Sequence, residues 1–120
     1  MSPIPEQNRR QHYRIVYPSV LAPRLILNAL VFAVVDISEW GVRFKKSDYF
    51  VFRPGVEVEG DITLFGGEKI HISGTIFRGQ NDDVVIALDR KIPFSVILSE
   101  QTQLRKSYYL EIEIGEKSEY

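Results

Sequence analysis

The feature that most constrains the fold is a two-residue alternation of apolar and polar side chains that recurs in short runs. It is clearest over residues 56–64, which read VEVEGDITL. A β-strand places successive side chains on opposite faces, so this pattern predicts a strand with one buried face. Similar runs at 70–77 and 84–88, separated from their neighbours by turn signals, predict further antiparallel strands.

The N-terminal apolar segments are also assigned to strands. Residues 13–21 predict a short or edge strand that is broken by Pro18. Residues 25–37 (LILNALVFAVVDI) could form a buried helix or a strand, and their β-branched content and the flanking proline and glycine favour one long strand. Residues 41–44 and 49–52 are shorter apolar alternations.

The sequence also contains glycine turn signals, and the spacing of its apolar residues changes toward the C-terminus. Gly66 and Gly67 predict a hairpin, and Gly60 predicts a bend within its strand. The apolar spacing then becomes helical, which predicts a helix over 93–107 that opens with a proline. Residues 108–114 (YYLEIEI) alternate and are left open between a final strand and a continuation of the helix. Together these elements predict an all-β barrel or sandwich capped by one C-terminal helix.

Length and composition narrow the classes of function. The 120 residues suit one domain, with 1–12 expected to form a flexible arm and 13–120 a folded domain. A net charge of -1 argues against a nucleic-acid polymer as partner, because such a protein needs a broad basic face. The absence of cysteine excludes disulfides and thiolate zinc sites and fits a cytoplasmic location. Neither a signal peptide nor membrane insertion is expected, since the longest apolar run, 29–35, is far shorter than the roughly 20 residues of a membrane helix.

The polar arm leads into a cluster of three arginines within six residues, Arg9, Arg10 and Arg14. A guanidinium presents a planar fork of donors, which suits phosphate oxygens and the O6/N7 edge of guanine. Arg10 and Arg14 are four residues apart and could hold an anionic ligand from two sides. The same cluster is also compatible with a solvated basic tail that binds nothing.

A second polar segment follows the long apolar run and contains Asp36, Ser38 and Gly41. A carboxylate can accept hydrogen bonds from the N1–H and N2–H₂ edge of guanine, and a serine hydroxyl can bind a base or a phosphate. Glycine allows a positive φ or a close approach of the backbone. Trp40 could stack on a base or pack against the rim of the barrel. The segment also fits an ordinary Asp- or Ser-containing turn that is closed by glycine.

The RQHYR of the arm and the DISEWG segment together resemble the PilZ family. That family is marked by an RxxxR motif before the first strand and a D/NxSxxG motif between the second and third strands. Both motifs are complete here and occur in the right order. Residues 74–78 (GTIFR) and the helix start at 92–94 (IPF) are also similar, so the resemblance extends from about Arg9 to Leu104.

The resemblance implies an all-β fold, namely a six-stranded antiparallel PilZ-type barrel with a flexible N-terminal arm and a C-terminal α-helix. It also implies cyclic di-GMP as the ligand. By position, Arg10 and Arg14 would clamp phosphates and guanine bases. Asp36 and Ser38 would read a guanine, and Gly41 would let the backbone come close.

Two further arginines are candidates at the same site. By resemblance, Arg9 would favour an intercalated pair of ligand molecules, whereas Arg78 would add a cation or be an ordinary surface residue at a strand end. The implied function is a cyclic di-GMP receptor of bacterial second-messenger signalling that changes conformation on binding and catalyses nothing. It would regulate an unidentified protein partner in motility, biofilm or exopolysaccharide pathways, as a monomer or a ligand-modulated dimer.

Alternatives to this interpretation stay open. A PilZ-like adaptor that binds no nucleotide would share the fold, although both motif arginines are present here. An oligonucleotide-binding barrel would display aromatic side chains along a basic groove, which the balanced charge disfavours. Neither catalysis, a cofactor nor a metal is expected, because His12 and His71 lack the companions of a catalytic triad and the spacing of metal ligands.

Overall fold

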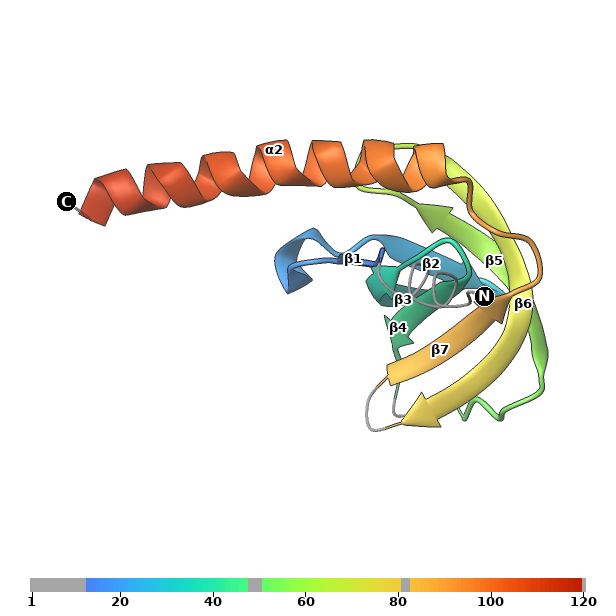
Figure 1. Ribbon diagram of the computed structural model, residues 1–120. Helices are drawn as coiled ribbons and strands as arrows, with labels where there is room; N and C mark the ends of the chain where they lie inside the picture. The colour runs from blue at the N-terminus through green and yellow to red at the C-terminus, as the bar shows by residue number, and fades with distance from the viewer. Residues whose placement is uncertain (1–12, 48–50, 81–82, 120) are drawn as a thin grey trace, which may run out of the picture.

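The computed structural model describes residues 13–47, 51–80 and 83–119, which form a β-barrel with one C-terminal helix (Figure 1). The elements are β1 (Ile15–Val16), η1 (Ser19–Leu21), β2 (Arg24–Leu27), β3 (Leu30–Ile37), β4 (Gly41–Lys45), β5 (Glu57–Thr63), β6 (Lys69–Gln80), β7 (Asp83–Leu88) and α2 (Phe94–Glu119). Six strands close into an antiparallel ring in the order β3-β2-β5-β6-β7-β4, because β4 pairs back to β3. The extra strand β1 pairs with β3 outside the ring. The predicted all-β, six-stranded PilZ-type barrel is therefore confirmed, with one strand added.

The barrel interior is filled by the inward side chains that the two-residue alternation predicted. In β7, Val84, Ile86 and Leu88 are buried, while the residues between them are more exposed. Three phenyl rings, those of Phe32, Phe44 and Phe52, pack with centroids 5.1 to 5.6 Å apart at tilted or edge-on angles. Phe52 reaches this cluster from a segment that is not a strand, so the alternation at 49–52 does not form one within its described part.

The predicted long strand over 25–37 is wrong, because the chain reverses in its middle. Strands β2 and β3 form a hairpin in which Leu27 pairs with Leu30. The two residues between them, Asn28 and Ala29, have positive φ angles of 51° and 69°. Such a pair is typical of the two-residue turns that match the twist of a hairpin, where asparagine followed by glycine is the usual sequence signal.

Gly60 has a different role from the predicted bend. Strand β5 passes through Gly60 in continuous register with both of its neighbours. A Cβ atom at this position would lie 2.1 Å from the carbonyl oxygen of Ile26 on β2. Glycine is therefore required so that β2 and β5 can approach each other. The hairpin predicted at Gly66 and Gly67 is confirmed, with Gly67 at a φ of 98° between β5 and β6.

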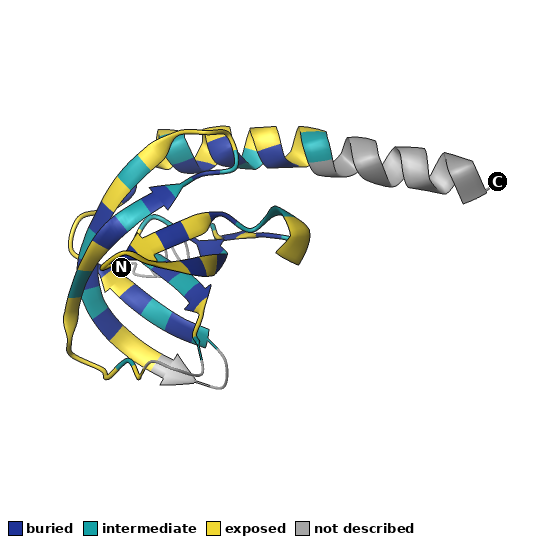
Figure 2. Ribbon diagram, turned by 180° about the vertical axis from the view of Figure 1, so that it is seen from behind, coloured by how far each residue is buried: buried dark blue, intermediate teal, exposed yellow. Residues whose placement is uncertain are grey.

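Helix α2 starts one residue after the predicted start and runs well past the predicted end at 107. Residues 108–114 are therefore helical, although their apolar residues alternate as in a strand. A helix satisfies its backbone hydrogen bonds within the segment, whereas a strand needs a neighbour to pair with. Ile97 and Leu104 are buried. Figure 2 shows buried positions in the part of α2 that lies over the barrel, and Figure 1 shows the helix running on beyond it. Among the described residues, no helix is both long and apolar enough to cross a membrane.

One buried carboxylate ties α2 to the barrel. Glu100 is only 3% exposed and accepts hydrogen bonds from the Tyr17 hydroxyl at 2.6 Å, the Phe65 N–H at 2.6 Å and the Gly66 N–H at 3.0 Å. Burial and the nearby Glu100 carboxylate raise the pKa of Tyr17 well above its ordinary value, so the phenol stays protonated and donates a hydrogen bond to the carboxylate. The chain following β1 and the turn between β5 and β6 are thus both fixed to the helix.

Candidate functional site

Asp36 is placed on the outer face of the barrel by a β-bulge near the end of β3. Val34 and Ile37 both point into the core, at 1% and 0% exposure, although they are three residues apart. An uninterrupted strand would send them to opposite faces, so the register shift between Val34 and Asp36 supplies the extra residue. Bulges re-aim side chains in this way, and here the result is a carboxylate on the outside that is nonetheless only 6% exposed.

Two guanidiniums cover this carboxylate. The Nε atom of Arg43 lies 3.0 Å from Oδ2 of Asp36, and the Nη1 atom of Arg14 lies 3.6 Å from the same oxygen. Nε of Arg43 is buried without an acceptor in good hydrogen-bonding geometry, so its contact with Asp36 is an ion pair rather than a well-aligned hydrogen bond. Arg43 also places Nη1 3.6 Å from Oδ2 of Asp83. The arginine of the first motif and the aspartate of the second therefore lie side by side.

The pKa of Asp36 is shifted from its ordinary value by the surroundings of the carboxyl group. Loss of hydration raises the pKa of Asp36 above its ordinary value, and the nearby Asp83 raises it further. The positive charges of Arg14 and Arg43 act in the opposite direction and offset the shift only in part. In the ligand-free protein the Asp36 carboxylate is therefore less well stabilised than it would be in water.

The remainder of the second motif forms the turn between β3 and β4. The Ser38 N–H donates to the Gly41 carbonyl at 2.9 Å, which closes the turn. Gly41 has no positive φ, and a Cβ atom on it would lie 3.6 Å from its nearest neighbours, an ordinary contact distance. The fold itself therefore does not demand glycine at position 41. Trp40 lies in the same turn and is 52% exposed, so its indole is accessible beside the motif.

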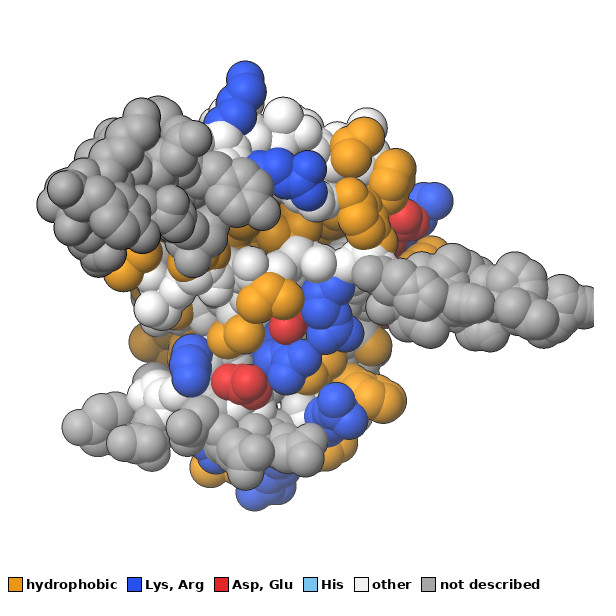
Figure 3. Space-filling model, turned by 60° about the vertical axis from the view of Figure 1, so that its left-hand side comes forward, with side chains coloured by type: hydrophobic (Ala, Val, Ile, Leu, Met, Phe, Trp, Pro, Cys, Tyr) orange, Lys and Arg blue, Asp and Glu red, His pale blue; other side chains and the backbone are white. Residues whose placement is uncertain are grey.

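The pairing of neighbouring strands places further residues in line with Asp36 across the barrel surface. Asp36 pairs with Arg43, Arg43 with Val85, and Val85 with Arg78, so these four residues form one row across β3, β4, β7 and β6. Paired Cα atoms lie about 5 Å apart, which places Arg78 within roughly 15 Å of Asp36. A second register shift precedes Arg78, whose guanidinium lies 5.6 Å from the ring centroid of the exposed Phe77. Figure 3 shows a face on which basic side chains gather around acidic ones, next to exposed apolar groups.

The structure thus brings together Arg14, Asp36, Ser38 and Gly41, and it puts Arg78 in the same row. Arg9 and Arg10 lie outside the described residues, as does the rest of the predicted arm. Sequence reasoning missed Arg43. Arg43 is two positions after Gly41 and faces the same side of β4, but its pairing with Asp36 depends on the register of β3 and β4, which a single sequence does not show.

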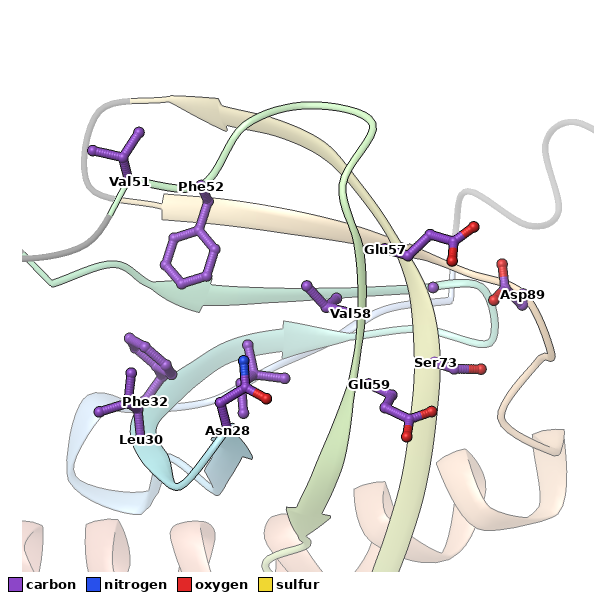
Figure 4. A pocket seen from close by; sticks show the side chains of 12 residues that line it. Asn28, Leu30, Phe32, Val51, Phe52, Glu57, Val58, Glu59, Ser73 and Asp89 are labelled. Atoms are coloured by element: carbon purple, nitrogen blue, oxygen red, sulfur yellow. The ribbon is translucent and has the colours of Figure 1, made fainter.

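A cavity of about 590 Å³ lies elsewhere. Its lining includes none of Arg14, Asp36, Ser38 and Gly41. In Figure 4 the apolar side chains of Phe32, Phe52 and Val58 lie on one side of β5, and the carboxylates of Glu57 and Asp89 lie on the other. A smaller groove of about 380 Å³ includes Arg14 and runs between the N-terminal segment and α2. Within the described part of the chain, no three His, Cys, Asp or Glu residues are placed to hold a metal ion.

Comparison with known proteins supports the fold. No protein-family model matches the sequence, and a search of curated proteins gave no match. The structure is similar to that of an uncharacterized Legionella protein, with a TM-score of 0.52 and 10% identity over 91% of this chain and 100% of that chain. It is also similar to the Bacillus subtilis inhibitor of motility MotI/DgrA, with a TM-score of 0.60 and 16% identity over 89% of this chain. The alignment covers 52% of the Bacillus protein, about half its length. These likenesses indicate a shared PilZ-like β-barrel.

Proposed function

We propose that this chain is a receptor for cyclic di-GMP that binds its ligand at the turn between β3 and β4. The observation that carries this proposal is the contact between Arg14 and Asp36, whose side chains come within 3.6 Å although the residues are far apart in the sequence. A ligand with two guanines and two phosphates needs guanidiniums for charge and a carboxylate for base recognition, and both are present here.

Each residue of the site would have a definite task. The Asp36 carboxylate would accept hydrogen bonds from a guanine edge, with Ser38 beside it and Gly41 leaving room for the base. Arg14 would exchange its contact with Asp36 for a phosphate. Trp40 offers an exposed indole for stacking, since it is 52% exposed.

The remaining arginines would act around this centre. By resemblance to the PilZ family, Arg10 would join Arg14 on the ligand, and Arg9 would favour a pair of ligand molecules. Arg43 and Arg78 would add positive charge along the row. Closure of residues 1–12 over the ligand would be the change that a partner protein detects.

The proposed role is therefore that of a cytoplasmic receptor without catalytic activity. MotI/DgrA is named an inhibitor of motility. This name favours motility among the processes that the protein could regulate through a partner, beside biofilm and exopolysaccharide formation. An adaptor that binds no nucleotide is the competing function.

Isothermal titration calorimetry with cyclic di-GMP tests the proposal. We expect binding by the wild-type protein and a loss of affinity of at least about tenfold, or 1.4 kcal/mol, in Arg14→Ala and in Asp36→Ala. Arg24→Ala and Asp89→Ala remove the same charges from exposed positions outside the site and are expected to bind normally. The absence of binding heat with the wild type would favour the adaptor, and unchanged affinity in both site variants would refute the site.

The chain contains a single tryptophan, which provides a second measurement. Because Trp40 lies in the turn that carries Ser38 and Gly41, we expect its fluorescence to change with cyclic di-GMP concentration along the calorimetric binding curve. Cyclic di-AMP has the same charge but lacks the guanine edge, so it is expected to leave the signal unchanged. An equal response to both nucleotides would contradict base recognition by Asp36.

A further inference from the structure

A groove of about 380 Å³ runs between β1 and helix α2. Residues 14–18 line it on one side, and Gln101, Leu104 and Arg105 of α2 line it on the other. Successive side chains of an extended segment point to opposite faces, so a groove lined by consecutive residues follows the edge of the segment rather than one of its faces. The edge of β1 therefore opens onto the groove.

This edge of β1 has no strand beside it. Among the described strands, each of the six in the ring has a neighbour on both sides, whereas β1 pairs only with β3. The Tyr17 N–H donates to the Val35 carbonyl of β3 at 3.0 Å. Backbone groups of successive strand residues point to alternate sides, so the N–H and C=O of Val16 point away from β3 and toward the groove. An extended peptide could hydrogen-bond to both groups, as when a strand is added to the edge of a sheet.

The side chains around the groove determine which kind of peptide would fit. Val16 is 63% exposed and supplies apolar surface, and the exposed Arg14 lies on the same face of β1. Arg105 comes from α2, which packs on the opposite face of this segment, where the Tyr17 hydroxyl donates to Glu100. An added strand would therefore meet one guanidinium on each of its faces.

The charge of the groove favours an acidic occupant over a second copy of β1. The described residues that line it include two arginines and no acidic side chain. A second β1 edge would bring its own Arg14 into the same space, and such like charges disfavour pairing. Carboxylates on a peptide would instead be attracted to both arginines.

We propose that β1 and α2 together bind an extended acidic segment of a partner protein, which adds an antiparallel strand to the open edge of β1. An apolar residue of the segment would lie opposite Val16 and exchange two backbone hydrogen bonds with it. The acidic residues that flank it would reach Arg105 on one face and Arg14 on the other. This inference does not rest on nucleotide binding, and the segment is expected to bind when no nucleotide is present.

Fluorescence anisotropy with a labelled, terminally blocked peptide of sequence EEVEE tests the proposal on the 120-residue chain without nucleotide. We expect the wild type to bind this peptide, to bind the basic peptide KKVKK at least about tenfold more weakly, and to lose affinity at high salt. N-methylation of the peptide valine removes the N–H that would donate to the Val16 carbonyl. This change is expected to weaken binding at least about fivefold, because strand addition depends on main-chain hydrogen bonds.

Variants of the protein test each wall of the groove. Val16→Pro removes the N–H that points into the groove, and a strand edge tolerates proline, so we expect at least about tenfold weaker binding. Val16→Ala keeps this N–H and is expected to bind within about threefold of wild type. Arg105→Glu is expected to bind at least about fivefold more weakly, because it places like charges in contact. Arg90→Glu is the matched control, since it reverses an exposed charge that does not line the groove.

Circular dichroism verifies that each variant is folded. A wild-type protein that does not bind the EEVEE peptide at about 1 mM would overturn the proposal. Equal binding of the KKVKK peptide, or wild-type affinity in both Val16→Pro and Arg105→Glu, would do the same. Undiminished binding of the N-methylated peptide would also overturn it, and this measurement needs no variant to fold. A wild-type dimer that Val16→Pro converts to a monomer would assign the edge to a second copy of the chain instead.

Discussion

Asp36 is a buried carboxyl with two guanidiniums on one of its oxygens. Burial and the nearby Asp83 together raise its pKa more than the arginines lower it, so the ionised form is incompletely stabilised. A guanine edge would supply two aligned N–H donors to this carboxylate, which is the form of hydrogen bonding that lowers a carboxyl pKa. The ligand-free site therefore has an acceptor whose charge a guanine would stabilise further.

The shifted pKa of Asp36 predicts a pH-dependent term in stability. The pKa of Asp36 is raised in the folded protein, so the protonated carboxyl stabilises the fold. This stabilisation is complete at pH values below the unfolded pKa, about 3.9, and is lost as the pH rises through the folded pKa. Asp36→Asn removes this term. We expect the free energy of unfolding of Asp36→Asn, relative to wild type, to increase as pH rises from 3.5 to 7. Urea denaturation across this range measures it, and a difference that decreases with pH would contradict the pKa shift.

At the residue scale, the two sequence motifs named residues of the candidate site that the structure brings together, and their binding of a ligand stays a prediction. The contact between Arg14 and Asp36 agrees with the expectation that the two motifs meet. Arg43 was missed because its position depends on how β3 and β4 pair, and the bulge before Asp36 alters that pairing. Neither the bulge nor the register has a signature in a single sequence, since both result from packing of the barrel as a whole.

The fold requires glycine at position 60, whereas at position 41 only the proposed ligand would require it. A methyl group on Gly41 would meet its neighbours at 3.6 Å, whereas one on Gly60 would lie 2.1 Å from a backbone oxygen. We therefore expect Gly41→Ala to change the free energy of unfolding by less than about 0.5 kcal/mol and to weaken cyclic di-GMP binding at least tenfold. Gly60→Ala is expected to destabilise the protein by about 2 kcal/mol or more.

Denaturation and calorimetry on the same preparations decide between these roles. If Gly41→Ala bound the nucleotide with wild-type affinity, the backbone at this turn would not lie against the ligand. If it unfolded as easily as Gly60→Ala, the glycine would be structural after all.

At the scale of elements, the sequence predicted strands wherever the alternation was regular and failed where a turn lacked its usual residues. The β2–β3 hairpin turns through Asn28 and Ala29, and alanine is a poor residue for a positive φ. Nothing in LILNALVF separates this turn from a continuous strand. The predicted helix was too short because YYLEIEI has the two-residue alternation of a strand, although the structure places it in α2.

The turn of the β2–β3 hairpin predicts a stabilising substitution. Ala29 has a φ of 69°, where an alanine is strained and a glycine is not. We expect Ala29→Gly to raise the free energy of unfolding by about 1 kcal/mol. Ala33→Gly makes the same change at an exposed position within β3 and is expected to lower the free energy by about 0.5 to 1 kcal/mol. Thermal and urea denaturation measure both, and a loss of stability in Ala29→Gly would contradict the turn conformation.

At the scale of the whole molecule, β1 and the residues around it connect the candidate nucleotide site to helix α2. Val16 pairs with Asp36, and the neighbouring Tyr17 donates its hydroxyl to Glu100 of the helix. Tyr13 hydrogen-bonds to Gln101 of α2, and its ring packs against that of Phe94. Arg14 lies between these contacts and belongs both to the ion pair with Asp36 and to the groove beside α2.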